Sequence, residues 1–176
     1  MFTLIDVLLR EHLSMRELLS VMQEEVETPG RPDYALMGEI LHYCESYPDA
    51  YHHPKEDLIY RAVCDRAPDV AAGIEDLEAE HMIMGSAAQE IRRLVKAAAG
   101  GDGEAEDSLG QKVGAYLRFY RMHMRREERE VFPVALEHLS KEDWLELETQ
   151  VVNPTDPYFA EKAAARLQEL LGRPKA

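Results

Sequence analysis

The residues of this chain that could bind a metal ion recur in two sets with nearly the same spacing. Each set has one histidine, followed further along the chain by a second histidine with a glutamate four positions after it. The sets are His12, His52 and Glu56, and then His81, His123 and Glu127. Equivalent residues lie 69, 71 and 71 positions apart, so an internal repeat presents the same side chains twice.

These residue types favour a site for two cations. A histidine and a glutamate four positions apart lie on one face of a helix, about one turn from each other, so both can reach a common centre. Imidazole and carboxylate ligands without thiolate suit iron, with manganese or zinc as alternatives. Six ligands exceed the four of a closed structural zinc site. We therefore expect two iron ions bridged by Glu56, Glu127 and an oxo or hydroxo group, with room for an exogenous ligand.

A second arrangement of metal ligands remains open from the sequence. Glu39 with His42 and Glu78 with His81 both spell Glu-x-x-His, the signature of ferritin-type di-iron sites, which also need a glutamate from each of two further helices. This arrangement leaves the duplicated spacing unexplained, and acidic helical surfaces produce Glu-x-x-His by chance.

Neighbours of the predicted ligands also have more than one interpretation. His53 replaces His52 as the ligand if a helix restarts at Pro54, because its imidazole then rotates inward. Otherwise it is a hydrogen-bond partner of the site or a surface residue. Asp57 and Glu128 follow the two predicted bridging glutamates, and we interpret both as solvated charges. Tyr116 and Tyr120 are core aromatics, or they supply a hydroxyl group to the metal or to its bound ligand.

Long amphipathic helices must carry these side chains. Clusters of proline, glycine and aspartate divide the chain, and apolar residues recur between them at helical spacing. Pro48 and Pro54 remove amide donors, so we expect the second helix to bend. Short connections between four helices predict an all-α, up-down-up-down antiparallel four-helix bundle. The predicted helices cover 3–27, 34–66, 71–98 and 106–138.

The sequence predicts a bundle over residues 1–139 and a helical extension over residues 140–176. Ser140 and Asp143 form a capping-box pattern at the start of a short helix. Pro157 is suited to the first position of a last helix, which ends near Gly172. We expect one or two short helices packed on or beside the bundle, or else a contact surface for a homodimer.

The composition excludes several classes of protein. The 176 residues are 45% hydrophobic and 31% charged, which fits a folded domain with a full core and not a disordered chain. A formal net charge of −14 repels phosphate backbones, so we expect no nucleic-acid partner. The absence of an apolar stretch of about 18 residues predicts no membrane span. We also find no pattern of a signal peptide and expect a cytoplasmic protein.

The sequence resembles the hemerythrin-like family, also called HHE cation-binding proteins, from Thr3 to Leu139. The resemblance lies in His12, the run from His52 to Asp57, His81, and the run from His123 to Pro133. It implies a four-helix bundle around a non-haem di-iron centre held by His12, His52, Glu56, His81, His123 and Glu127. Oxygen-carrying hemerythrins have a second histidine one turn after that of the third helix, where this chain has Gly85. They also have an aspartate where this chain has Glu127.

These two departures argue against a role in oxygen transport. The resemblance is closer to branches associated with iron or oxygen sensing, nitrosative stress and repair of iron–sulfur centres, or peroxide handling. We therefore expect a di-iron protein that binds or senses O2, nitric oxide, peroxide or iron. The alternatives are a redox enzyme acting on nitric oxide or peroxide, an iron donor in iron–sulfur repair, and a fold that metal merely stabilises. The sequence leaves open whether the protein is an enzyme.

Overall fold

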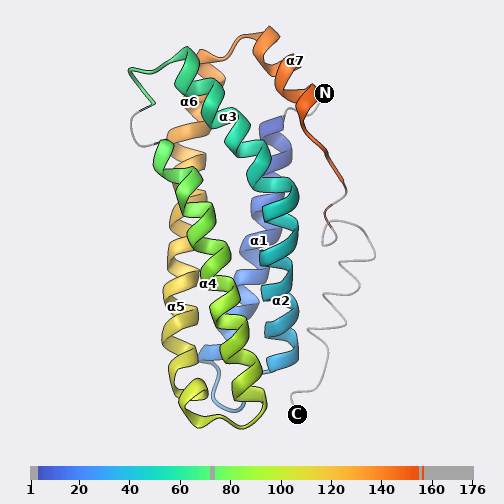
Figure 1. Cartoon of the computed structure of the whole chain (residues 1–176), viewed down its shortest axis with the longest axis vertical. Coiled ribbons are helices and arrows are strands. Elements are labelled where there is room, and N and C mark those ends of the chain that lie inside the picture. The colour runs from blue at the N-terminus through green and yellow to red at the C-terminus, as the bar shows by residue number, and fades with distance from the viewer. Residues whose placement is uncertain (1–3, 72–73, 155, 157–176) are drawn as a thin grey trace.

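Helices make up all of the regular secondary structure in the described part of the chain (Figure 1). The computed structural model describes residues 4–71, 74–154 and 156. Its α-helices are α1 (Leu4–Glu27), α2 (Tyr34–Tyr47), α3 (His53–Arg66), α4 (Glu75–Ala99), α5 (Gly103–Arg126), α6 (Phe132–His138) and α7 (Lys141–Gln150). Two π-helical turns, η1 (Pro48–His52) and η2 (Glu127–Val131), join α2 to α3 and α5 to α6. The all-helical prediction is confirmed for these residues.

The long helices lie side by side along the long axis of the molecule (Figure 1). The helix α4 packs against both α2 and α5, and α1 packs against α5 and α2. At the other end, α3 packs against α6 and α4. The connections from α1 to α2 and from α4 to α5 lie at one end of the molecule, and the chain passes from α3 to α4 at the opposite end.

Side-chain caps fix where several helices begin. The Asp33 carboxylate accepts hydrogen bonds from two amides at the start of α2, and Asp102 does the same for α5. Because Asp102 caps Glu104 and Ala105, α5 begins at Gly103, three residues before the predicted start. The capping box of Ser140 with Asp143 is present and opens α7. The last helix predicted from Pro157 lies outside the described residues.

Both π-helical turns end directly before a His-Pro or Phe-Pro pair. The amide of His53 bonds to the carbonyl of Pro48, and the amide of Phe132 bonds to that of Glu127. A proline in a helix lacks an amide donor and crowds the carbonyl four residues earlier. The backbone hydrogen bonds before it therefore span five residues instead of four. The predicted bend of the second helix is present, and α3 leans away from the axis of α2 (Figure 1). The second π-helical turn was not predicted, although Pro133 signals it.

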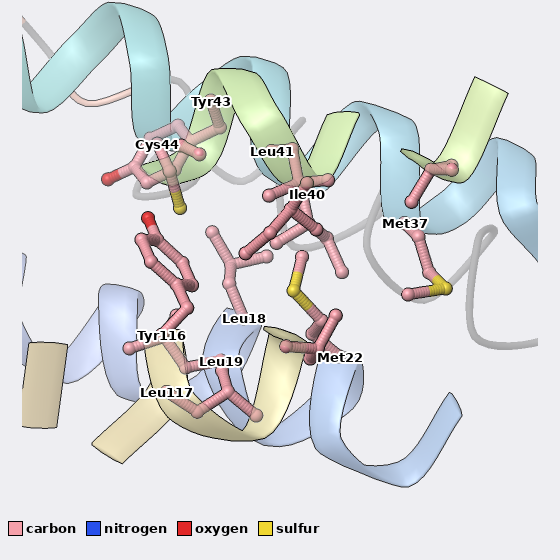
Figure 2. Packing of buried hydrophobic residues seen from close by; sticks show 14 of the residues in the cluster. Leu18, Leu19, Met22, Met37, Ile40, Leu41, Tyr43, Cys44, Tyr116 and Leu117 are labelled. Carbon is pink, nitrogen blue, oxygen red and sulfur yellow. The ribbon is translucent and has the colours of Figure 1, made fainter. Parts of the chain in front are cut away.

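Two apolar clusters fill the interior, with a polar layer between them. The larger cluster joins α1, α2, α4 and α5, and residues such as Leu19, Met22 and Met37 are completely buried in it (Figure 2). The smaller cluster joins α1, α3 and α6 with parts of α4 and α7, and Leu8 and Ile59 are completely buried in it. In the part of the chain that the structure describes, no helix has the length and apolarity needed to cross a membrane.

Candidate metal centre

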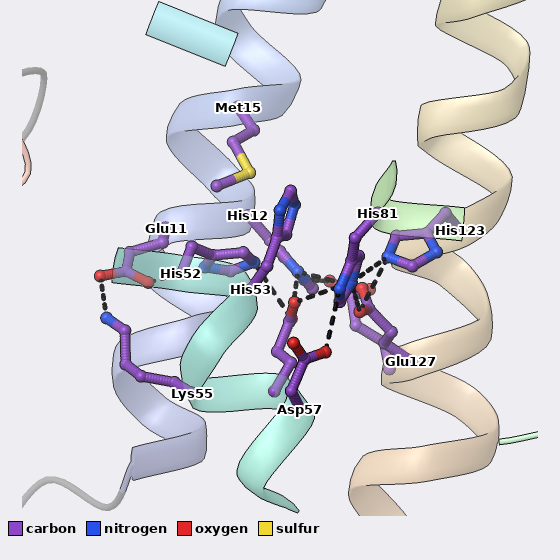
Figure 3. Close-up of polar contacts among 12 residues, drawn as sticks. Glu11, His12, Met15, His52, His53, Lys55, Asp57, His81, His123 and Glu127 are labelled. Atoms are coloured by element: carbon purple, nitrogen blue, oxygen red, sulfur yellow. Dashed lines mark hydrogen bonds and ion pairs between the residues drawn. The ribbon is translucent and has the colours of Figure 1, made fainter. Parts of the chain in front are cut away.

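The structure brings all six predicted ligands together in the polar layer (Figure 3). Each of them comes from a different helical element, and none exposes more than 7% of its surface. They are His12 of α1, His52 of η1, Glu56 of α3, His81 of α4, His123 of α5 and Glu127 of η2. Residues far apart in the sequence therefore meet in one buried volume.

The carboxylate of Glu56 lies between two pairs of imidazoles. Its Oε1 is 3.0 Å from His52 Nε2 and 3.3 Å from His12 Nε2. Its Oε2 is 3.5 Å from His81 Nε2. One oxygen thus faces the pair formed by His12 and His52, and the other faces the pair formed by His81 and His123.

The carboxylate of Glu127 has the mirror arrangement. Its Oε1 is 3.0 Å from His123 Nε2 and 3.7 Å from His81 Nε2, whereas its Oε2 is 3.3 Å from His12 Nε2. The hydroxyl of Tyr60 also donates a hydrogen bond to Oε1. Both glutamates therefore have the geometry of a carboxylate that bridges two cation positions.

The chemistry of the buried donors fits cations at these positions. Within the described residues, His12 Nε2, both oxygens of Glu56 and Glu127 Oε2 are buried without a conventional hydrogen-bond partner. In addition, His81 Nε2 lies 3.0 Å from His123 Nε2. Buried polar atoms of this kind are costly unless they are hydrogen-bonded or bound to metal. Imidazole nitrogens and carboxylate oxygens are iron ligands, so the residues present fit a pair of metal ions.

Each imidazole is oriented by a carboxylate on its other nitrogen. The Nδ1 groups of His12, His52, His81 and His123 lie 2.7–3.1 Å from Glu128, Glu11, Asp57 and Glu80, respectively. An ionised carboxylate only accepts hydrogen bonds, so the proton lies on Nδ1 and Nε2 faces the centre. This is the usual arrangement behind metal-binding histidines. The interpretation of Asp57 and Glu128 as solvated charges was therefore wrong.

A buried lysine supports one of these carboxylates. Lys55 is only 1% exposed, and its ammonium group donates to Glu11 Oε1 over 2.6 Å. The hydroxyl of Tyr47 donates to the same oxygen over 2.8 Å. Glu11 Oε2 accepts a hydrogen bond from His52 Nδ1 at 2.7 Å, and Figure 3 shows Glu11 between His52 and Lys55. Lys55 and Tyr47 therefore fix the carboxylate that orients His52.

The second half of the chain repeats this arrangement with an arginine. The guanidinium group of Arg126 donates to Glu80, and Glu80 accepts from His123 Nδ1 at 2.8 Å. Sequence reasoning missed Glu11, Lys55, Glu80 and Arg126. The signal was present, because Glu80 follows Glu11 by 69 positions and Arg126 follows Lys55 by 71, the same offsets as in the predicted ligands.

Electrostatics in the centre favour charged groups despite burial. Burial raises the pKa of Glu127, but the imidazoles of His123 and His12 beside its carboxylate outweigh burial and hold the pKa well below its usual value. Burial lowers the pKa of His81, but hydrogen bonds to Asp57 and Glu127 outweigh it and raise the pKa to about 10. The metal-free centre thus attracts positive charge.

The remaining candidates from the sequence take other positions. His53 is buried, but its Nδ1 bonds to Asp49 at 3.0 Å and its ring lies parallel to that of His81 with centroids 4.0 Å apart. The structure thus places His52, and not His53, against the glutamates. Tyr120 donates to the sulfur of Met15 at 3.4 Å.

The other tyrosine and the ferritin-type pattern also lie apart from the centre. Tyr116 belongs to the larger apolar cluster and points toward Cys44 (Figure 2). In the ferritin-type arrangement, Glu78 would be a ligand, yet it pairs with Arg61 at the surface over 2.6 Å. Glu39 and His42 line a groove on the outside of α2.

A groove of about 360 Å³ reaches the centre from outside. It is lined by His53, Asp57, His81 and Gly85, among others. A Cβ atom at Gly85 would lie 3.2 Å from Asp49 Oδ2, so the carboxylate of Asp49 occupies the space beside this glycine. The groove lets a small molecule approach the side of the centre formed by His81.

The fold and this site define a helical protein with a buried histidine and glutamate cation site. The sequence matches the family model for the Hemerythrin HHE cation binding domain over residues 3–135, and the chain belongs to this family. The resemblance seen in the sequence is thereby confirmed. Neither the search of curated proteins nor the search of solved structures found a match.

Proposed function

We propose that the protein is a binuclear non-haem iron protein that binds or senses a small ligand such as O2, nitric oxide or peroxide. The observation that carries this proposal is that the two oxygens of each glutamate face different pairs of imidazoles. Glu56 and Glu127 each direct one oxygen to the side of His12 and the other to the side of His81. A single cation would not need two carboxylates that both span the site.

The helix arrangement supports an up-down-up-down four-helix bundle as the scaffold. The four segments are α1, α2 with α3, α4, and α5 with α6. Their connections alternate between the two ends of the molecule (Figure 1). Such a bundle positions metal ligands by projecting them inward from facing helices.

Iron is the proposed metal because the ligands are imidazole and carboxylate without thiolate. When bound, iron would supply redox chemistry and open coordination positions for a small ligand. The chain itself encloses the centre between two apolar clusters. The Tyr60 hydroxyl holds the Glu127 carboxylate in place, and the groove beside Gly85 provides access from solvent.

Metal analysis of the purified protein, with optical spectra in air, after anaerobic reduction and after addition of nitric oxide, tests this proposal. We expect about two iron atoms per chain, charge-transfer absorption in the near ultraviolet, and a spectral change with nitric oxide that reverses when the gas is removed. One tetrahedral zinc per chain would contradict the proposal. An unchanged spectrum with nitric oxide and with peroxide would refute the role in ligand binding.

Matched variants show whether the predicted residues hold the metal. Glu56→Ala and Glu127→Ala should each remove metal and lower the melting temperature, because each removes an oxygen from both cation positions. His138→Ala is the control, since His138 lies at the end of α6, outside the ligand set. Equal metal content in all three variants would show that the ligand set is wrong.

A further inference from the structure

Another groove, of about 490 Å³, lies where α1 passes the junction of α5 and η2. Four of the six residues that line it are arginines, and the other two are a serine and a glutamate. They are Arg16 and Ser20 of α1, Arg121 and Arg125 of α5, and Glu128 and Arg129 of η2. The chain as a whole has a formal net charge of −14, so this groove has the opposite sign to the rest of the molecule.

The positive charge of the groove is only partly balanced. Arg16 donates to Glu128 over 2.5 Å. Arg121 donates to two neutral oxygens, those of the Gln23 amide and of a serine hydroxyl. Arg125 and Arg129 are exposed, and neither forms an ion pair within the described residues. One carboxylate therefore faces four guanidinium groups.

The other half of the molecule shows that the fold does not require these arginines. Gly85 lies 69 positions after Arg16, and Asp57 lies 71 positions before Glu128, the same offsets as in the predicted ligands. The groove at Gly85 is therefore the counterpart of this one. Among the described residues that line that counterpart, there is no arginine or lysine. The four guanidinium groups are a property of this groove and not of the repeated scaffold.

We propose that the arginine groove binds a small molecule that carries a diphosphate group. The guanidinium group presents its donors as a planar fork that matches the oxygens of a phosphate group. A volume of about 490 Å³ lies in the usual range for small-molecule sites. Glu128 accepts hydrogen bonds from both Arg16 and His12, so the bound anion would lie one carboxylate away from a metal ligand.

The charge of the rest of the chain favours a compact anion over a long one. A nucleic acid or an acidic protein surface would extend beyond the groove and meet a molecule of net charge −14, which repels it. A diphosphate group would contact only the guanidinium groups and gain charge-assisted hydrogen bonds from them.

Titration calorimetry with the full chain as purified, in about 0.15 M salt to screen long-range attraction, tests this proposal. The probes are pyrophosphate and ADP. The test variant is the double substitution Arg125→Gln with Arg129→Gln, because both side chains are exposed and unpaired within the described residues. Arg93→Gln is the control, since it removes a positive charge from an exposed position of α4 outside the groove.

We expect one pyrophosphate per chain in the wild type and in Arg93→Gln, with affinity at least about tenfold lower in the double variant because two charge-assisted contacts are lost. Equal affinity for ADP would show that the site recognises the diphosphate group alone, and higher affinity for ADP would identify a nucleotide.

Absence of saturable binding in the wild type would overturn the proposal. So would equal affinity in the wild type and the double variant, because the anion would then bind elsewhere, such as at the metal centre. Tighter binding of a hexaglutamate peptide than of either probe would also overturn it and assign the groove to an acidic protein segment.

Discussion

The two halves of the molecule hold the centre with equivalent residues but build their surroundings differently. In the first half, Lys55 supports Glu11 and is 1% exposed. In the second, the side chain of Arg126 supports Glu80 and is 27% exposed. The π-helical turn ends at the histidine of the His-x-x-x-Glu pair in the first half, and it begins at the glutamate of that pair in the second half. The comparison shows that the repeat is kept where side chains face the centre and lost where they face the rest of the fold.

The largest difference between the halves should appear in the stability of Lys55→Met and Arg126→Met. Lys55→Met leaves Glu11 buried without its cation, which costs about 3–5 kcal/mol in the free energy of unfolding. Arg126→Met removes a partly exposed ion pair, which costs about 1 kcal/mol or less. Urea unfolding of both variants measures the difference. Equal losses would show that burial does not distinguish the two carboxylates.

A smaller and equal effect is expected from the carboxylates that orient the first histidine of each half. Asp57→Ala frees His81, and Glu128→Ala frees His12. Loss of such a partner lowers metal affinity by about 10–100-fold, and the equivalence of the halves predicts similar losses. Competition with a chelator of known affinity measures both. Glu130→Ala is the control because its side chain is 68% exposed. A loss in only one variant would break the equivalence.

The pH dependence of stability and of metal affinity should also reflect both halves of the molecule. Burial lowers the pKa of His12, but the carboxylates of Glu127, Glu128 and Glu56 beside its ring outweigh burial and raise the pKa well above 6.5. Asp57 and Glu127 likewise raise the pKa of the buried His81 to about 10. These imidazoles stabilise the metal-free fold fully below pH 6.5, and less as the pH rises toward 10. Metal must displace their protons, so the affinity should increase from pH 6 to pH 9. Isothermal titration in buffers of different ionisation enthalpy should show a net release of protons when metal binds. Release of none would contradict these protonation states.

Much of the centre could be predicted because its residues follow the repeat. The positions of His12 and Glu127, and their meeting in the interior, follow from helical spacing and from the cost of burying polar groups. The partners on Nδ1 also follow the repeat, but a carboxylate beside a ligand is indistinguishable in sequence from a solvated charge. Only packing shows that Glu128 reaches His12 across the bundle.

Other features depend on the three-dimensional environment and were not predictable from spacing. Tyr60 meets Glu127 because α3 leans toward α6 after the π-helical turn, and the sequence holds no equivalent tyrosine in the second half. The burial of Lys55 depends on Glu11 and Tyr47 arriving from other helices. Lysine is rarely buried without a paired partner, so its position on α3 alone predicts exposure.

The hydrogen bonds from His12 to Glu128 and from His81 to Asp57 cross between the halves in opposite directions. Neither half therefore contains the carboxylate that sets the tautomer of its own first histidine. A gene that encoded only one repeat would therefore give a complete centre only as a pair of identical subunits exchanging these contacts. The present chain contains both repeats, so both partners of each crossing hydrogen bond belong to one polypeptide.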